Sequence, residues 1–318
     1  MKFFQLIRYK NLLIIIATMI LMRYFIIEPI LLSYGLALQM PTGVFIMLVM
    51  ATVLIAAGGY VINDYFDTRT DLVNKPGEVI VGQEVTRREA IAMHMVLSTL
   101  GIVLGLVVSF KVGRPVFSLL FFLTAGILWF YSTLYKRQLI VGNLVVSVLT
   151  GLIPLIPLVF ELPLLGNFWE VIAVYQLDLH QLVYWVGGYA TMAFLLTFVR
   201  EIIKDIEDFE GDFTYGRNTI PVRYGIKTAK VTAASMLGIT MLALVYLFAA
   251  YMRQLSTGEF DFVTFSYFFL FIVVPCFVLL VMILLAQEKK DYHRASGFCK
   301  LIMLFGLLYA FIFRWFIV

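Results

Sequence analysis

The chain has 318 residues, of which 62% are hydrophobic and 14% are charged. Soluble domains average about 45–50% apolar and about 25% charged residues, so this composition excludes a soluble globular protein and indicates a polytopic membrane protein. The two cysteines and three histidines do not favour a disulfide framework or a zinc or iron site, and the net charge of +4 matters less than its distribution along the chain.

Nine apolar runs are each close to the roughly 20 residues that a bilayer-crossing helix needs. We therefore predict an all-α membrane protein with nine transmembrane helices. The predicted spans are Leu12–Leu32, Gly43–Ile62, Ala90–Phe110, Val116–Tyr135, Leu139–Phe160, Gln181–Val199, Ala229–Tyr251, Phe265–Ala286 and Phe298–Phe316.

Positive charge predicts the orientation of these spans. If the N-terminus is inside, the outer segments carry only Lys111, Arg114, Arg253 and Arg314, while Arg23 and Arg200 lie within spans or at their ends. The other 18 of the 24 lysines and arginines then lie on the inner segments. The positive-inside rule therefore predicts a multi-pass protein with a cytoplasmic N-terminus, in the inner membrane if the source is a bacterium.

Two acidic clusters stand out from the apolar background. The stretch Asn63-Asp64-Tyr65-Phe66-Asp67-Thr68-Arg69-Thr70-Asp71 follows the second span, and its three aspartates at i, i+3 and i+7 share one face of a helix. The same spacing recurs after the sixth span, at Asp205, Asp208 and Asp212. Both clusters are predicted on the cytoplasmic side, which places the candidate active site there.

Acidic side chains next to hydrocarbon are costly and usually mark function. One alternative is that these are solvated acids at helix ends, because inner loops are often charged. The repeated spacing favours a shared ligand instead, and hard divalent cations that hold a phosphorylated substrate are the natural candidate. Magnesium between the acids and a diphosphate reverses the sign of the local interaction and withdraws charge from the leaving oxygen.

The clusters also suggest how the chain is organised. The second and sixth spans are four positions apart in the order of spans, an even number, so the two helices that lead into the clusters point the same way. We predict one domain over residues 1–318, built of parallel four-helix repeats at about 1–138 and 139–288 with a ninth helix at 298–316.

These motifs resemble those of a known family. Asn63-Asp64-x-x-Asp67-x-x-x-Asp71 is similar to the first signature of the UbiA superfamily of intramembrane prenyltransferases, and Asp208-x-x-x-Asp212 is similar to the second. The resemblance covers essentially the whole chain. Two further segments also fit the family: Arg8-x-x-Asn11 and Gly216…Thr219-Ile220-Pro221…Gly225.

The resemblance implies nine helices around a central cavity that opens to the lipid. It implies Mg²⁺-dependent transfer of a prenyl group from a prenyl diphosphate to a lipophilic acceptor, with no nucleic acid and no obligate protein partner. Carried over by position, one Mg²⁺ is held by Asn63, Asp64, Asp67 and Asp71, and the other by Asp208 and Asp212. Asp205 extends the second motif by one helical turn and completes the set of catalytic aspartates.

Basic residues are expected to meet the diphosphate oxygens that the metals leave free. The candidates are Lys136, Arg137, Lys204 and Arg217, and the polar candidates for substrate binding are Asn11, Asn63 and Asn143. The alternatives are ordinary inner-side charge for the basic residues and a helix N-cap for Asn11. Arg23, inside the first span, is expected either to face the cavity or to snorkel outward.

The sequence leaves three hypotheses for the function, two of which differ in the acceptor. The segment from Arg200 to Asp212, with Gly216 and Thr219-Ile220-Pro221, looks most like the branch of the family that prenylates geranylgeranylglyceryl phosphate. The nucleophile is then a glycerol hydroxyl. A second hypothesis is an aromatic acceptor such as 4-hydroxybenzoate or a naphthoate. A third, from another class, is an ion-coupled transporter, although transporter sites lie near the bilayer midplane and these acids lie at helix ends.

Overall fold

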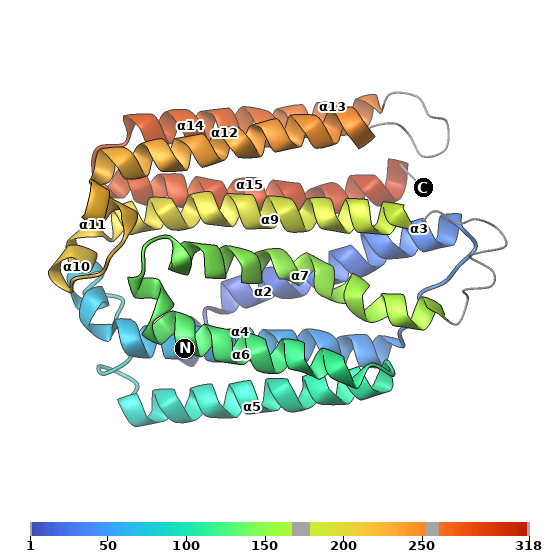
Figure 1. Cartoon of the computed structure of the whole chain (residues 1–318), viewed down its shortest axis with the longest axis horizontal. Coiled ribbons are helices and arrows are strands. Elements are labelled where there is room, and N and C mark those ends of the chain that lie inside the picture. Colours follow the sequence, from blue (N-terminus) through green and yellow to red (C-terminus); the bar gives the residue numbers. More distant parts are fainter. Residues whose placement is uncertain (1, 167–178, 252–260, 317–318) are drawn as a thin grey trace.

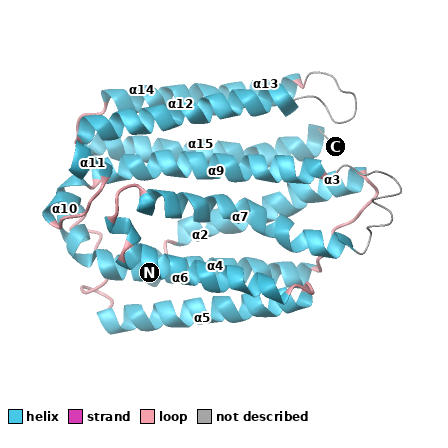
Figure 2. Ribbon diagram, in the orientation of Figure 1, coloured by secondary structure: helices cyan, strands magenta, loops and turns pink. Residues whose placement is uncertain are grey.

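The computed structural model describes residues 2–166, 179–251 and 261–316 (Figure 1). These residues form helices joined by turns, with one isolated bridge between Val81 and Val85 (Figure 2). Within the described ranges, nine helical segments are long and apolar enough to cross a membrane, which confirms the predicted fold class. Helices dominate because backbone groups in hydrocarbon have no water to bond and must satisfy one another.

Several spans are composite. The first combines α2, a π-helical segment η1 and α3, and the eighth combines α13, the π-helical η5 and α14. In chain order the helices are α1 (Lys2–Leu6), α2 (Tyr9–Leu21), η1 (Met22–Ile27), α3 (Glu28–Ser33), α4 (Thr42–Asn74), α5 (Arg87–Lys111), η2 (Pro115–Phe117), α6 (Ser118–Thr133), η3 (Tyr135–Arg137), α7 (Val141–Leu165), α9 (His180–Glu207), α10 (Phe209–Thr214), α11 (Ile220–Tyr224), α12 (Ile226–Tyr251), α13 (Phe262–Phe268), η5 (Phe269–Val273), α14 (Val274–Leu285) and α15 (Lys289–Phe316).

Helix α4 is longer than the sequence predicted. The apolar run ends near Ile62, but the helix continues to Asn74 and has 33 residues. At about 1.5 Å per residue it is about 50 Å long, which exceeds the roughly 30 Å of a hydrocarbon core. Its last three turns therefore extend beyond the apolar layer, and these turns carry the first acidic cluster.

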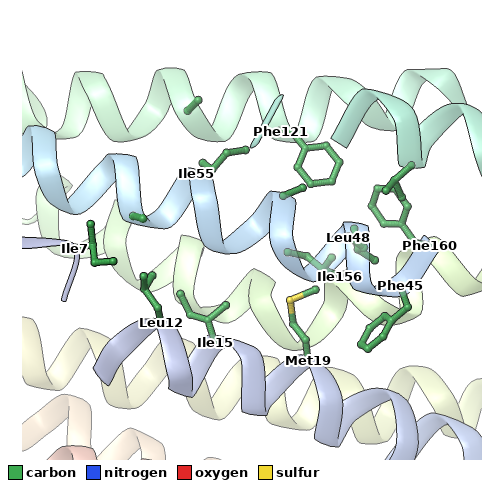
Figure 3. Packing of buried hydrophobic residues seen from close by; sticks show 14 of the residues in the cluster. Ile7, Leu12, Ile15, Met19, Phe45, Leu48, Ile55, Phe121, Ile156 and Phe160 are labelled. Atoms are coloured by element: carbon green, nitrogen blue, oxygen red, sulfur yellow. The ribbon is translucent and has the colours of Figure 1, made fainter. Parts of the chain in front are cut away.

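The helices pack into two groups joined by α2 and α7. In one group α4 packs against α5 and α6, and in the other α9 packs against α12 and α15 (Figure 1). Figure 3 shows side chains of the first group and its neighbours meeting in one core: Leu12, Ile15 and Met19 from α2, Phe45, Leu48 and Ile55 from α4, Phe121 from α6, and Ile156 and Phe160 from α7. A separate core of buried side chains unites α9, α12, α14 and α15.

A cavity of about 1510 Å³ lies between the two groups. Its walls come from α2, α4, α6, α7, α9 and α15. Pockets for drug-sized ligands usually enclose about 300–1,000 Å³, so this cavity has room for a larger, lipid-like molecule or for two ligands at once.

Glycines allow α5 to approach α4 closely. Small residues are common at helix contacts in membranes because backbones can then pack closely. A Cβ added at Gly101 would lie 2.6 Å from Cγ1 of Ile55 and 3.0 Å from the carbonyl oxygen of Ala51. Nearby, Nδ1 of His94 lies 2.9 Å from the carbonyl oxygen of Gly58, which adds a polar tie between the same two helices.

We expect Gly101→Ala to destabilise the protein, because the added methyl group pushes α5 away from α4. Overpacking of this kind costs about 1–3 kcal/mol. The measurement is the unfolding temperature of purified protein in detergent, which should fall by several degrees. Gly126→Ala in α6 is the matched control, because a Cβ there meets no atom within 4 Å. Equal unfolding temperatures for the two variants would contradict the close α4–α5 contact.

Candidate active site

The first acidic cluster faces the cavity from the end of α4. Asn63, Asp64, Asp67 and Asp71 all line it, as the helical spacing predicts. Asp64 accepts a hydrogen bond of 2.7 Å from Arg8 at the start of α2. Arg8 has a left-handed backbone (φ 52°), and its guanidinium lies 5.2 Å from the centre of the Tyr60 ring. These contacts fix one wall of the cavity entrance.

The second cluster does not form one helical face, and in this the structure corrects the sequence-based expectation. Helix α9 ends at Glu207, Asp208 has a non-helical conformation, and α10 begins at Phe209. Asp208 lines both the main cavity and a small adjoining recess of about 40 Å³, whereas Asp205 and Asp212 line only the recess. The bend turns the last aspartate back towards α4.

Arg217 joins the two clusters directly. One terminal nitrogen of its guanidinium lies 2.5 Å from Oδ1 of Asp67, and the other lies 3.3 Å from Oδ1 of Asp212. Lys136 of η3 contacts the other carboxylate oxygen of Asp67 and donates to Oδ1 of Asn63 at 3.2 Å. Residues that are 145 positions apart, Asp67 and Asp212, thus belong to one network of charges.

Burial and charge together shift the protonation of this network. Burial raises the pKa of Asp212 to about 6. Burial is the largest influence and alone would lower the pKa of Lys136 and that of Arg217, but their neighbours, Asp67 foremost, together outweigh it and raise both values. Both basic side chains therefore remain charged at neutral pH and can bind an anion.

Asn74 fixes the end of α4 to α10, which lie next to each other at one end of the bundle (Figure 1). Its Nδ2 donates to the carbonyl oxygen of Asp208 at 3.1 Å, and its Oδ1 accepts from the backbone N–H of Gly211 at 2.9 Å. A Cβ on Gly211 would lie 2.5 Å from Asn74, so only glycine allows this approach. Lys289 of α15 donates to the carbonyl oxygen of Asn74 at 2.7 Å and adds a third element.

The oxygen donors suit a hard divalent cation. Oδ1 of Asp208 is buried and accepts no hydrogen bond, and the Asp71 carboxylate forms none with the described residues. Within the described ranges no three acidic, thiol or imidazole groups are yet close enough to share one ion. Asp64 and Asp67 are engaged instead by basic side chains, which an incoming anion can draw away.

The other predicted binding residues fall into three situations. Asn143 of α7 donates to Oδ2 of Asp205 at 2.8 Å, and both line the recess. Asn11 lines the main cavity near Tyr60, and Lys204 lines both cavities. Arg137 is exposed and lines neither cavity. Its backbone carbonyl accepts a hydrogen bond from the N–H of Asn218.

Sequence reasoning did not single out several residues that line the cavity. Arg200 and Lys300 are two of them, and the signal for Arg200 was present, because a charge at the end of an apolar run is a functional candidate by default. Tyr131 was not among the expected site residues either, yet it lines both cavities, as Lys136 does. Asn74 gave no signal, because its partners lie more than 130 residues away.

Arg23 follows neither of its two expected orientations. It is 2% exposed, lies outside the lining of both cavities and donates to the carbonyl oxygen of Met40. Its guanidinium carbon lies 4.5 Å from the centre of the Phe45 ring, and its nearest approach to the buried carboxylate of Glu161 is 4.0 Å. Glu161 also accepts from the backbone N–H of Met40 at 3.0 Å, so this pair anchors the turn before α4.

Residues 26–298 match the family described as the UbiA prenyltransferase family. This chain belongs to the UbiA prenyltransferase family. The match confirms the resemblance seen in the paired aspartate motifs, and it makes the chain a prenyltransferase.

Several curated relatives of this UbiA prenyltransferase share one name. The chain is 31% identical over 263 residues to digeranylgeranylglyceryl phosphate synthase of Thermococcus gammatolerans, an alignment that covers 82% of this chain and 83% of the relative. It is 30% identical over 265 residues to the protein of the same name from Methanosphaera stadtmanae, with 82% and 83% covered.

Solved structures of the family share the fold. A structure of digeranylgeranylglyceryl phosphate synthase in membranes superposes with a TM-score of 0.61 at 21% identity, covering 98% of this chain and 97% of that one. A UbiA homologue from Archaeoglobus fulgidus bound to DMAPP and Mg²⁺ gives a TM-score of 0.55 at 14% identity, with 99% of each chain covered.

We expect Asn74→Ala to loosen the segment that carries the second cluster, because both hydrogen bonds from α4 to α10 are lost. The measurement is the rate of tryptic cleavage after Arg217 and Arg223 in folded protein, which should rise several-fold. Gln138→Ala is the control, because this exposed residue uses only its backbone in the interactions found for it. Unchanged cleavage in Asn74→Ala would mean that α10 is held by other contacts.

Proposed function

We propose that the protein transfers a prenyl group from a prenyl diphosphate to the hydroxyl of a prenylated glycerol phosphate. The observation that carries this proposal is the ion-pair network of Asp67, Lys136, Arg217 and Asp212 at one end of a large, mostly apolar cavity. Charges at the membrane surface suit a diphosphate, and the apolar volume suits the chains attached to it. The name shared by the curated relatives supports the choice of acceptor.

We assign the oxygen ligands of Mg²⁺ to the same residues that the motifs indicate. Asn63, Asp64, Asp67 and Asp71 would hold one ion, and Asp208 with Asp212 would hold the other. Oδ1 of Asp208, which accepts no hydrogen bond and meets only the Lys75 ammonium at 3.9 Å, supports this assignment. Bound Mg²⁺ would neutralise the diphosphate and make it a better leaving group.

Lys136 and Arg217 are the diphosphate-binding cations in this proposal. In the protein alone they neutralise Asp67. When substrate enters, both exchange this carboxylate for phosphate oxygens, and charge-assisted hydrogen bonds of this kind are the strong ones. The pair then stabilises the charge that develops on diphosphate as the allylic C–O bond breaks.

The transfer step breaks one carbon–oxygen bond and forms another. The bond between the allylic carbon and the diphosphate oxygen breaks, and a bond from the same carbon to the glycerol oxygen forms. The hydroxyl proton goes to an aspartate carboxylate of either cluster or to the departing diphosphate. The apolar walls exclude water, which would otherwise compete for the allylic cation.

We also propose that the active site faces the cytoplasm. Positive charge gathers on the segments at the same end as both aspartate clusters, as the positive-inside rule requires for an inner side. The charged headgroups of both substrates would then enter from the cytoplasm while their chains remain in the bilayer.

We expect the purified protein to form diphosphate and a doubly prenylated glycerol phosphate when given geranylgeranyl diphosphate, Mg²⁺ and a panel of acceptors. The panel contains a prenylated glycerol phosphate, 4-hydroxybenzoate and a naphthoate, and products are identified by mass spectrometry. Chelation with EDTA should stop the reaction. Product from an aromatic acceptor alone would reject the proposed acceptor.

In the same assay Asp208→Asn should lower turnover at least a hundredfold, since loss of even an outer contact of a metal site costs about 10–100-fold. Glu210→Gln is the control, because Glu210 is an exposed acid only two residues away. Wild-type turnover in Asp208→Asn would reject the metal assignment.

We expect cysteines placed at the two ends of α6 to report the orientation. Arg114 and Gln138 are exposed and flank this helix, while both native cysteines are buried. In intact cells a membrane-impermeant maleimide should label Arg114→Cys at once and Gln138→Cys only after permeabilisation. The opposite pattern would place the aspartate clusters outside.

A further inference from the structure

A second group of charges lines the cavity on the wall opposite the first aspartate cluster. Arg200 and Lys204 stand one helical turn apart on α9, and Lys300 projects from α15, which packs beside α9 (Figure 1). All three line the main cavity. Lys300 lies close enough to Arg200 and Lys204 for their charges to act on it.

This group carries more positive than negative charge. Glu201 is its nearest acid, 2.7 Å from a terminal nitrogen of Arg200 and within electrostatic range of Lys204. Neither Lys204 nor Lys300 forms an ion pair with the described residues, and Nε of Arg200 is buried without a hydrogen-bond partner. Three cations against Glu201 leave an excess of positive charge, which Asp208, close enough to act on Lys204, reduces in part.

An excess of positive charge is energetically costly within membrane-spanning helices. Arg200 lies seven residues before the end of α9, and Lys300 lies eleven residues into α15, so both are about two or three turns inside their helices. Uncompensated charges within membrane-spanning helices are rare and typically serve a ligand. A phosphate monoester carries about −1.5 to −2 charges at pH 7, which matches this excess.

The diphosphate already has its own partners. Lys136 and Arg217 contact Asp67, whereas Arg200 and Lys300 contact none of the six motif aspartates. Lys136 and Lys204 line both the main cavity and the recess, whereas Arg200 and Lys300 line the main cavity alone and Arg217 lines the recess alone. Positive charge therefore extends beyond the diphosphate-binding pair into the main cavity, where Arg200 and Lys300 stand.

We propose that Arg200, Lys204 and Lys300 bind the phosphate of the acceptor lipid. This inference rests on the proposed function, and it assigns Lys204 to the acceptor rather than to the diphosphate. Beyond Lys300 on α15, Met303, Leu304 and Leu307 line the same cavity and offer an apolar path for the acceptor chain. An acceptor anchored here presents its glycerol hydroxyl towards the aspartates across the cavity.

Lys300→Gln tests the assignment, with Lys290→Gln as the matched control. Lys290 lies on the same helix but pairs with Glu288 on the exposed surface. Each variant is assayed with a prenylated glycerol phosphate and with the corresponding phosphate-free prenylated glycerol. We expect Lys300→Gln to lower the ratio of kcat/KM values for these two acceptors about tenfold or more, because a charge-assisted contact is lost. KM for geranylgeranyl diphosphate should stay unchanged, and Lys300→Arg should restore most of the ratio.

Other outcomes overturn the assignment. Equal losses with both acceptors, or a raised KM for geranylgeranyl diphosphate, would mean that these cations serve the donor or the fold. If the wild type transfers to no glycerol acceptor, the proposed function fails. The inference is then decided by a binding measurement: the shift in unfolding temperature that the prenylated glycerol phosphate alone causes in each protein. Stabilisation that Lys300→Gln loses and Lys290→Gln keeps supports it; equal stabilisation of all three proteins, or none, overturns it.

Discussion

The interaction on which the structure depends is the link that Arg217 makes between Asp67 and Asp212. Asp67 lies on α4 and Asp212 on α10, which packs against the end of α4, so two buried carboxylates face one another there. A cation between two carboxylates offsets their repulsion, and Lys136 adds a second positive charge from η3. The protein thus keeps its acidic site assembled before any substrate arrives. The same cations are free to turn to phosphate, so one set of residues serves assembly and binding in succession.

Much of this could be predicted from sequence because the bilayer imposes simple rules. Apolar runs of spanning length give the helices, and the i, i+3, i+7 spacing gives the inward face of the first cluster. The bend at Asp208 could not be foreseen, because helical spacing continues through it in the sequence. Its cause is tertiary: Asn74 bonds the carbonyl of Asp208 and the N–H of Gly211 and holds α10 at an angle to α9.

Arg23 illustrates a different limit. Intramembrane arginines are expected to face a cavity or reach for the surface, and the sequence holds no sign of a third solution. The third solution requires Glu161, an aromatic ring from α4 and the carbonyl of Met40 to converge. None of these is close in sequence, so only the packed chain reveals that this charge holds a turn instead of a ligand. Arg23 therefore differs from Arg200: Arg23 is buried away from the cavity, whereas Arg200 lines it.

The distribution of charge within the cavity suits the two anionic substrates of the proposed reaction. If both headgroups shared one cluster of cations, their repulsion would oppose simultaneous binding, and transfer requires both at once. The cations reach from Arg217 in the recess, through Lys136 and Lys204, to Arg200 and Lys300 in the main cavity, so each headgroup can have its own counter-charge. The apolar walls then keep both chains aligned below. Glu201 beside Arg200 and within electrostatic range of Lys204 fits the same logic: one carboxylate lowers the cost of holding these cations in the cavity wall without cancelling the charge that a phosphate needs.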